Sequence, residues 1–152
     1  MDHDHAAKGT TLKALRITVA ILAAMALAGC GRIFKDKTVA EKAVSHFHDQ
    51  YNQGQIEEIW KDADPAFTSA APRLSYGEFM GSLQRKLGKV VSTSNVGWHV
   101  NFYNQQTTVR LVQETVFEHG NGTESFAFTI NGTNAVLLGY HVESGELNLD
   151  HL

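Results

Sequence analysis

The spacing of apolar residues changes near Val90, and this change constrains the fold more than any other feature of the sequence. Before it, apolar residues recur every three or four positions, which indicates amphipathic helices. After it, apolar and polar residues alternate, which indicates strands with one buried face. Helices followed by a run of strands predict an α+β domain.

The first helix is expected over about residues 38–51, because its apolar residues form a stripe that ends at Tyr51. Thr38 and Glu41 have the spacing of a capping box at its start. A shorter helix is expected over residues 56–63. Its apolar face would consist of Ile56, Ile59, Trp60 and Ala63.

Two prolines, Pro65 and Pro72, are predicted to bracket a loop that carries Phe67. A second capping box, Ser75 to Glu78, would open a third helix that ends at Gly88. The apolar side of that helix would consist of Phe79, Met80, Leu83 and Leu87.

Four strands are expected after Val90. Short turns at Gly120–Gly122 and at Asn131-Gly132 would join consecutive strands, which predicts an antiparallel meander. One face of the sheet should therefore pack against helix. The residues predicted to face inward are Trp98, Val100, Phe102, Val109, Leu111, Gln113, Thr115, Phe117, Phe126, Phe128, Ile130, Val136, Leu138, Tyr140 and Val142.

The chain begins with a basic segment, and twelve mostly apolar residues, Ile17–Ala28, follow it. As a helix this run would reach about 18 Å, which is too short for a bilayer core of about 30 Å. It has the length of a signal-peptide core. The alternative is a short buried helix in front of a structural cysteine.

The four residues Leu27-Ala28-Gly29-Cys30 resemble the lipobox of bacterial lipoproteins. The resemblance implies removal of residues 1–29 and acylation of Cys30, the only cysteine. Residues 30–37 would then be the lipidated cysteine and a polar tether, and residues 38–150 a single domain. Gly31 in place of Asp favours the outer membrane, facing the periplasm, by the sorting rule of enterobacterial lipoproteins. With Cys30 acylated, no thiol remains for a disulfide.

Residues 30–152 contain ten basic and fourteen acidic residues. This balance disfavours nucleic acid, whose partners present a basic face. It also leaves no polybasic patch for membrane binding, so a lipid would have to provide the anchor. Two or three acyl chains would hold the chain firmly.

Several stretches resemble a family of small uncharacterised bacterial lipoproteins with a cystatin-like, or nuclear-transport-factor-like, fold. They are YNQGQIEEIW (51–60), ADPAF (63–67), FMGSLQRKLG (79–88), TVFEHGNGTESFAF (115–128) and LLGYHVESGEL (137–147). The resemblance implies a cone in which the long helix lies in the concavity of a curved four-stranded sheet. It implies no reaction.

Enzymes of the cone fold hold an Asp, His or Tyr in the cavity, where burial tunes its pKa. The predicted inward positions offer amide, hydroxyl, phenol and indole groups, and neither a carboxylate nor an imidazole. The domain is therefore predicted not to be an enzyme. A one-residue shift of a strand would instead turn Glu114 and His99 inward as acid–base candidates.

Four aromatic residues, Tyr51, Trp60, Trp98 and Tyr140, either line a small-molecule pocket or belong to the core. Neither a metal nor a cofactor is expected. His46 and His48 do not share a helix face. Asp62 and Asp64 are expected to cap a turn rather than act as a catalytic dyad. His99 and His141 are predicted to face outward.

Three classes of function remain open. The first is a non-enzymatic envelope lipoprotein that binds an envelope protein or a small apolar ligand. The second is a small-molecule enzyme of the cone type. The third is a structural component whose sheet contacts a larger envelope complex.

Overall fold

The structure, a computed structural model, describes residues 31–147. The chain forms two compact units, residues 1–35 and residues 36–152. Of the first unit only residues 31–35 are described, and they are helical. The predicted signal peptide and Cys30 lie outside the described residues. Among the residues described, no helix is both long enough and apolar enough to span a membrane.

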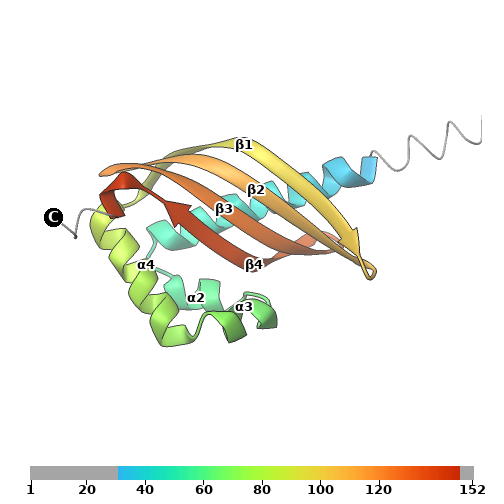
Figure 1. Cartoon of the computed structure of the whole chain (residues 1–152), viewed down its shortest axis with the longest axis horizontal. Helices are drawn as coiled ribbons and strands as arrows, with labels where there is room; N and C mark the ends of the chain where they lie inside the picture. Colours follow the sequence, from blue (N-terminus) through green and yellow to red (C-terminus); the bar gives the residue numbers. More distant parts are fainter. Residues whose placement is uncertain (1–30, 148–152) are drawn as a thin grey trace, which may run out of the picture. The chain divides into compact units, whose positions relative to one another are not determined.

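The second unit is an α+β domain, as predicted, with helices packed against a four-stranded antiparallel sheet (Figure 1). A long helix extends to residue 52. The other helices are α2 (Ile56–Lys61), α3 (Pro65–Ala70) and α4 (Arg73–Leu87), and the strands are β1 (Val90–Tyr103), β2 (Gln106–Phe117), β3 (Gly120–Asn131) and β4 (Asn134–Glu143).

The predicted start of the long helix is wrong. Residues 31–37 are helical, so Thr38 lies inside the helix rather than at its N-cap. The polar composition of these residues suggested a tether, but Lys and Arg are good helix formers. The predicted end is confirmed, because the helix stops at residue 52 and Gly54 takes a φ of 73°.

Residues 65–72 were predicted to form a loop, and most of them form helix α3 instead. Pro65 occupies the first helical position, where its missing N–H is not needed. The side chain of Asp64 caps this helix by accepting a hydrogen bond from the Ala66 N–H at 2.9 Å, which confirms the predicted capping role. Helix α4 begins at Arg73, so the capping box predicted at Ser75 is also wrong.

The sheet has the order β1-β2-β3-β4, which is the predicted meander. Between β1 and β2 the turn consists of Asn104 and Gln105, both with positive φ. Between β2 and β3 it consists of residues 118 and 119, two residues earlier than predicted. Strand β3 therefore begins at Gly120 and is longer at its start than the sequence suggested.

The two edges of the sheet differ. Strand β1 is an edge strand whose pairing with β2 shifts twice, once at Val91 and once at Val96. At the other edge, the Asp64 N–H donates to the carbonyl oxygen of Leu137 in β4 at 2.8 Å. The start of α3 thus closes part of the β4 edge, while β1 carries two bulges.

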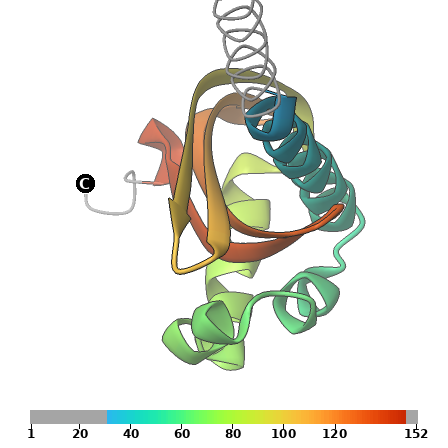
Figure 2. The same ribbon diagram turned by 90° about the vertical axis from the view of Figure 1, so that its right-hand side faces the viewer.

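The core lies between the inward face of the sheet and the long helix, which Figure 2 shows against one side of the curved sheet. Strand β2 alternates buried and exposed residues as predicted. Strand β1 departs from the prediction, because Trp98 is 44% exposed and Phe102 is 64% exposed. Both residues pair with buried positions of β2, so their face is the predicted one, but the edge strand leaves them uncovered.

Candidate functional site

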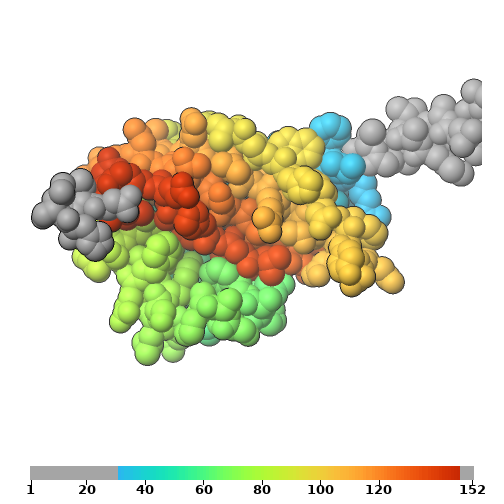
Figure 3. Space-filling model, viewed as in Figure 1, coloured from blue at the N-terminus to red at the C-terminus, as the bar shows by residue number. Residues whose placement is uncertain are grey.

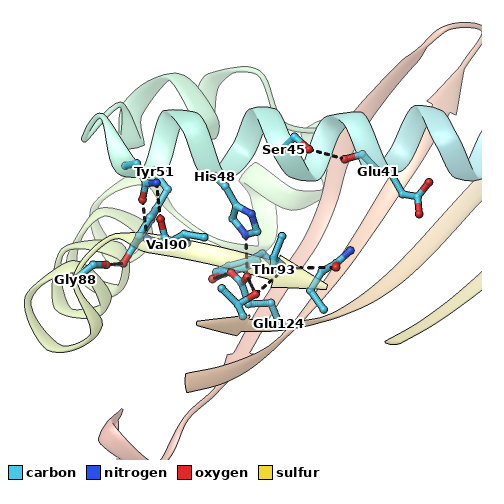
Figure 4. Close-up of polar contacts among 12 residues, drawn as sticks. Glu41, Ser45, His48, Tyr51, Gly88, Val90, Thr93 and Glu124 are labelled. Atoms are coloured by element: carbon cyan, nitrogen blue, oxygen red, sulfur yellow. Dashed lines mark hydrogen bonds and ion pairs between the residues drawn. The ribbon is translucent and has the colours of Figure 1, made fainter. Parts of the chain in front are cut away.

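A buried acid–base pair joins the long helix to the sheet. Nε2 of His48 lies 2.8 Å from Oε2 of Glu124 in β3, and Figure 4 shows the imidazole pointing from the helix towards this carboxyl group. His48 is 6% exposed and Glu124 is 1% exposed. A carboxylate only accepts hydrogen bonds, so the ring N–H of His48 is the donor when Glu124 is ionised.

Two further hydroxyl groups bind the same carboxyl group. The Thr115 hydroxyl donates to Oε2 of Glu124 at 2.5 Å, and the Tyr140 hydroxyl donates to Oε1 at 2.7 Å. Thr93 lies one strand further, with its hydroxyl 3.0 Å from that of Thr115. The helix and all four strands therefore contribute to one polar cluster: His48, Thr93, Thr115, Glu124 and Tyr140.

Aromatic rings enclose the cluster. Phe126 packs edge-on against the His48 ring at a centroid distance of 5.7 Å, and it lies 5.1 Å from the Tyr140 ring. Phe47 contacts both the Phe126 and the Tyr140 rings. Burial, and then the nearby Glu124 carboxylate, raise the pKa of Tyr140 well above 10. The phenol is thereby kept protonated as a donor to Glu124.

The prediction that the inward face lacks a carboxylate is wrong, because Glu124 occupies it. The sequence-based prediction put the turn at Gly120–Gly122, so the inward-facing positions of the third strand were assigned only from Phe126 onward. Glu124 is two residues before Phe126 and therefore points to the same side. His48 was also missed, although it lies four residues after Val44 and three before Tyr51, both buried. These spacings place it on the apolar stripe.

A hollow between the long helix, α2 and the sheet has a volume of about 70 Å³. Pockets for small molecules usually measure about 300–1,000 Å³. His46, Phe47 and Leu137 line this hollow, whereas His48, Glu124 and Tyr140 do not. The acid–base pair therefore lies outside this hollow, and both of its side chains are almost completely buried.

The four aromatic residues proposed from the sequence as ligand contacts do not line a common pocket. The hydroxyl of Tyr51 donates to the Gly88 carbonyl at 2.9 Å, in the core. The indole N–H of Trp60 donates to the Ala71 carbonyl at 2.8 Å. Tyr140 binds Glu124, and Trp98 lies on the edge strand with the Lys37 ammonium 5.9 Å from its ring centre.

The other candidates from the sequence lie apart from the buried cluster. Glu114 and His99 are exposed on the outer face of the sheet, so the one-residue register shift does not occur. His141 is also exposed. Asp62 lines the small hollow and Asp64 caps α3. Among residues 31–147, no group of three or more His, Cys, Asp or Glu side chains is arranged to hold a metal ion.

A second hollow, of about 370 Å³, lies between α2 and α4. Trp60, Tyr76 and the ion pair of Arg73 with Glu57 line it; Arg73 Nε lies 2.7 Å from Glu57 Oε2. The hydroxyl of Tyr76 is buried and has no hydrogen-bond partner among the described residues. Burial raises the pKa of this phenol.

An open groove of about 710 Å³ crosses the outer face of the sheet. Its floor includes one residue from each strand, in register across the sheet: Ser94, Glu114, Thr123 and Glu143. The groove carries two exposed carboxylates, those of Glu114 and Glu143. Its other lining residues are Ser92, Thr93, Thr115, Val116, Asn121, Gly122, Ser144 and Gly145.

The sequence matches no protein-family model and none of the curated proteins. Among solved structures, it is similar to that of Bdellovibrio bacteriovorus Bd1075, with 13% sequence identity and a TM-score of 0.46. That match covers 69% of this chain and 39% of the Bd1075 chain, so the present chain spans well under half the length of that protein.

Proposed function

We propose that this chain is an envelope lipoprotein, held to a membrane by acyl chains on Cys30, whose α+β domain acts by binding rather than by catalysis. The order of basic segment, apolar core and Leu27-Ala28-Gly29-Cys30 supports the anchor. The almost complete burial of the His48–Glu124 pair supports a binding role rather than catalysis.

The burial of the His48–Glu124 pair is the observation that carries this proposal. Acid–base catalysis needs a titratable group within about 3 Å of the reacting atom, directly or through one water. Glu124 meets groups of its own chain instead: His48 and Thr115 at one oxygen and Tyr140 at the other. His48 is 6% exposed and Glu124 is 1% exposed, so the pair has almost no surface that a substrate could reach.

The outer groove is the surface we assign to a binding partner. It is ten times larger than the hollow beneath the helix, and it is open to solvent. Two carboxylates, Glu114 and Glu143, would attract a partner that presents basic groups. A structural role in a larger envelope complex would use this same face.

The anchor is tested by replacing Cys30. Cys30→Ser should abolish labelling by a palmitate analogue in cells and leave unprocessed or soluble protein. Gly31→Asp is the matched variant, because it should keep the label but move the protein from the outer to the inner membrane. A Cys30→Ser protein that is still labelled and membrane-bound would contradict the proposal.

The binding role is tested by in-cell crosslinking. A photoactivatable residue in place of Glu114 should form a defined adduct with an envelope component. The same residue in place of Glu78, which is exposed on α4, should not. Equal adducts at both positions would show that the groove has no special part in binding.

A further inference from the structure

The tip of the β1–β2 hairpin exposes two large aromatic side chains. Phe102 is 64% exposed and Tyr103 is 72% exposed. The turn beyond them consists of Asn104 and Gln105, and no residue from 100 to 109 carries a formal charge. Figure 3 shows the side chains of this hairpin, yellow to orange, at the surface. An uncharged tip with exposed aromatic rings is suited to the interface between lipid and water.

This tip lies at the same end of the domain as the start of the long helix in the second unit. Asn52, at the far end of the helix, exchanges hydrogen bonds with the backbone of Val90, where β1 begins. Lys37 lies beside Trp98, further along β1. The helix and β1 thus run side by side in opposite directions (Figure 1). At about 3.3 Å per residue, the hairpin tip extends about 17 Å beyond Trp98.

The chain itself limits how far the lipid can be from this end. Six residue steps lead from Cys30 to Asp36, the first residue of the second unit. Even fully extended, they would reach only about 22 Å, at roughly 3.6 Å per residue. The acylated cysteine can therefore lie no more than about 22 Å from Asp36, which is at the end of the domain that carries the hairpin tip.

The acidic residues of the sheet are gathered towards the opposite end. Glu114 and Glu143 share one row across the sheet, and Glu124 is buried next to that row. Apart from the buried Glu124, strand residues between this row and the two hairpin tips include Arg110 but neither Asp nor Glu. The second hairpin at this end, between β3 and β4, is uncharged as well. The two hairpin tips at this end therefore avoid repulsion from anionic headgroups.

We propose that the β1–β2 hairpin tip rests in the headgroup region of the membrane that holds the Cys30 lipid, with Phe102 and Tyr103 as the contacts. This inference depends on the proposed anchor. The contact fixes which way the domain faces, and it turns the acidic groove away from the bilayer. The partner of this surface is a phospholipid bilayer.

The test uses the full lipidated chain, reconstituted in vesicles of phosphatidylethanolamine and phosphatidylglycerol. Gln106, which pairs with Tyr103, is replaced by Cys and labelled with an environment-sensitive fluorophore. Asn121→Cys, on an exposed residue near the opposite turn, is the matched position. The wild-type chain should take no label, because Cys30 is acylated.

The label at position 106 should shift to the blue, lose fluorescence to nitroxide-bearing lipids and resist iodide in the water. The label at position 121 should behave in the opposite way. Replacing both Phe102 and Tyr103 by Ser should return label 106 to water, whereas Val116→Ser, which removes an exposed apolar residue elsewhere, should leave it in lipid.

Flotation of the vesicles separates the two proposals. If the protein floats with the vesicles but label 106 is as accessible to iodide as label 121, the hairpin contact is refuted and the anchor stands. If the protein does not float, the anchor is refuted, and the hairpin contact, which depends on it, is refuted as well.

Discussion

His48 and Glu124 are 76 positions apart in sequence, and their side chains meet at 2.8 Å in the interior of the domain. The long helix supplies the imidazole and β3 supplies the carboxyl group. Because Tyr140 and Thr115 bind the same carboxyl group, the four side chains form one enclosed unit. Its effects should therefore be visible in stability.

Removing Glu124 should destabilise the domain severely. Glu124→Ala leaves a cavity, and it leaves the donors of His48, Thr115 and Tyr140 without their acceptor. The free energy of unfolding should therefore fall by about 3–5 kcal/mol, as for other broken buried pairs. Glu114→Ala is the matched control, because this residue is exposed on the other face of the sheet, and its effect should stay within about 0.5 kcal/mol. Urea unfolding of residues 31–152 measures both. Equal losses would contradict the buried role of Glu124.

Stability should fall steeply in alkali. Burial raises the pKa of Tyr51, Tyr76 and Tyr140 above 10 in the folded state. Above pH 10 the unfolded chain releases the phenol protons, while the folded chain keeps them. The contribution of these tyrosines to the free energy of unfolding is therefore fully present below pH 10 and is lost as the pH rises further. Each group adds a slope of up to about 1.4 kcal/mol per pH unit.

Ultraviolet absorbance of ionised tyrosine, recorded together with circular dichroism, checks this expectation. The ionisation of these three tyrosines should coincide with unfolding. Tyr140→Phe should make the slope shallower, and it should also lower stability at neutral pH because Glu124 loses a donor. An unchanged slope would contradict the raised pKa of Tyr140.

Trp98 and Leu111 occupy paired positions on β1 and β2, yet substituting them should have different effects. Leu111 is fully buried, so Leu111→Ala should cost about 2–5 kcal/mol. Trp98 is 44% exposed, so Trp98→Ala should cost about 1–2 kcal/mol, including its contact with Lys37. Thermal and urea melts measure both losses. If Trp98→Ala cost more stability than Leu111→Ala, Trp98 would be covered in solution.

Gly88 should not tolerate a side chain. It ends α4 with a φ of 74°, and a Cβ there would lie 2.6 Å from a Glu118 carboxylate oxygen and 2.9 Å from the Glu118 Cβ. Gly88→Ala should therefore destabilise the domain by about 1–3 kcal/mol. Gly77→Ala, inside the same helix and with open space around the new methyl group, should stabilise it by about 0.5–1 kcal/mol. A gain at Gly88 would contradict the strained turn.

The sequence was sufficient to predict the α+β class, the four-stranded meander and the faces of β2. These features follow from the period of the apolar residues, which is a local signal. Helix α3 was missed because six residues around Phe67 are too few to show a period. The burial of Trp98 was overestimated, because alternation identifies the face of a strand but not whether another element covers it.

The buried pair could have been predicted only in part. Glu124 was on the inward face by simple alternation once the turn was placed at residues 118 and 119, and His48 was on the apolar stripe of the helix. Their contact depends on how the long helix lies across the sheet. No local pattern encodes that arrangement, because it results from packing residues far apart in sequence.

The two edges of the sheet determine whether neighbouring copies of the domain can pair strand to strand. Exposed strands invite neighbouring chains to polymerise by adding strand to strand. Here the start of α3 obstructs β4 through the contact of Asp64 with Leu137, and the bulges at Val91 and Val96 leave β1 with only short regular runs. A foreign strand could follow β1 for the seven residues from Gly97 to Tyr103 before losing register. Pairing between copies is therefore limited to this run of β1, and fibre growth by strand addition, which needs both edges of each sheet, is disfavoured.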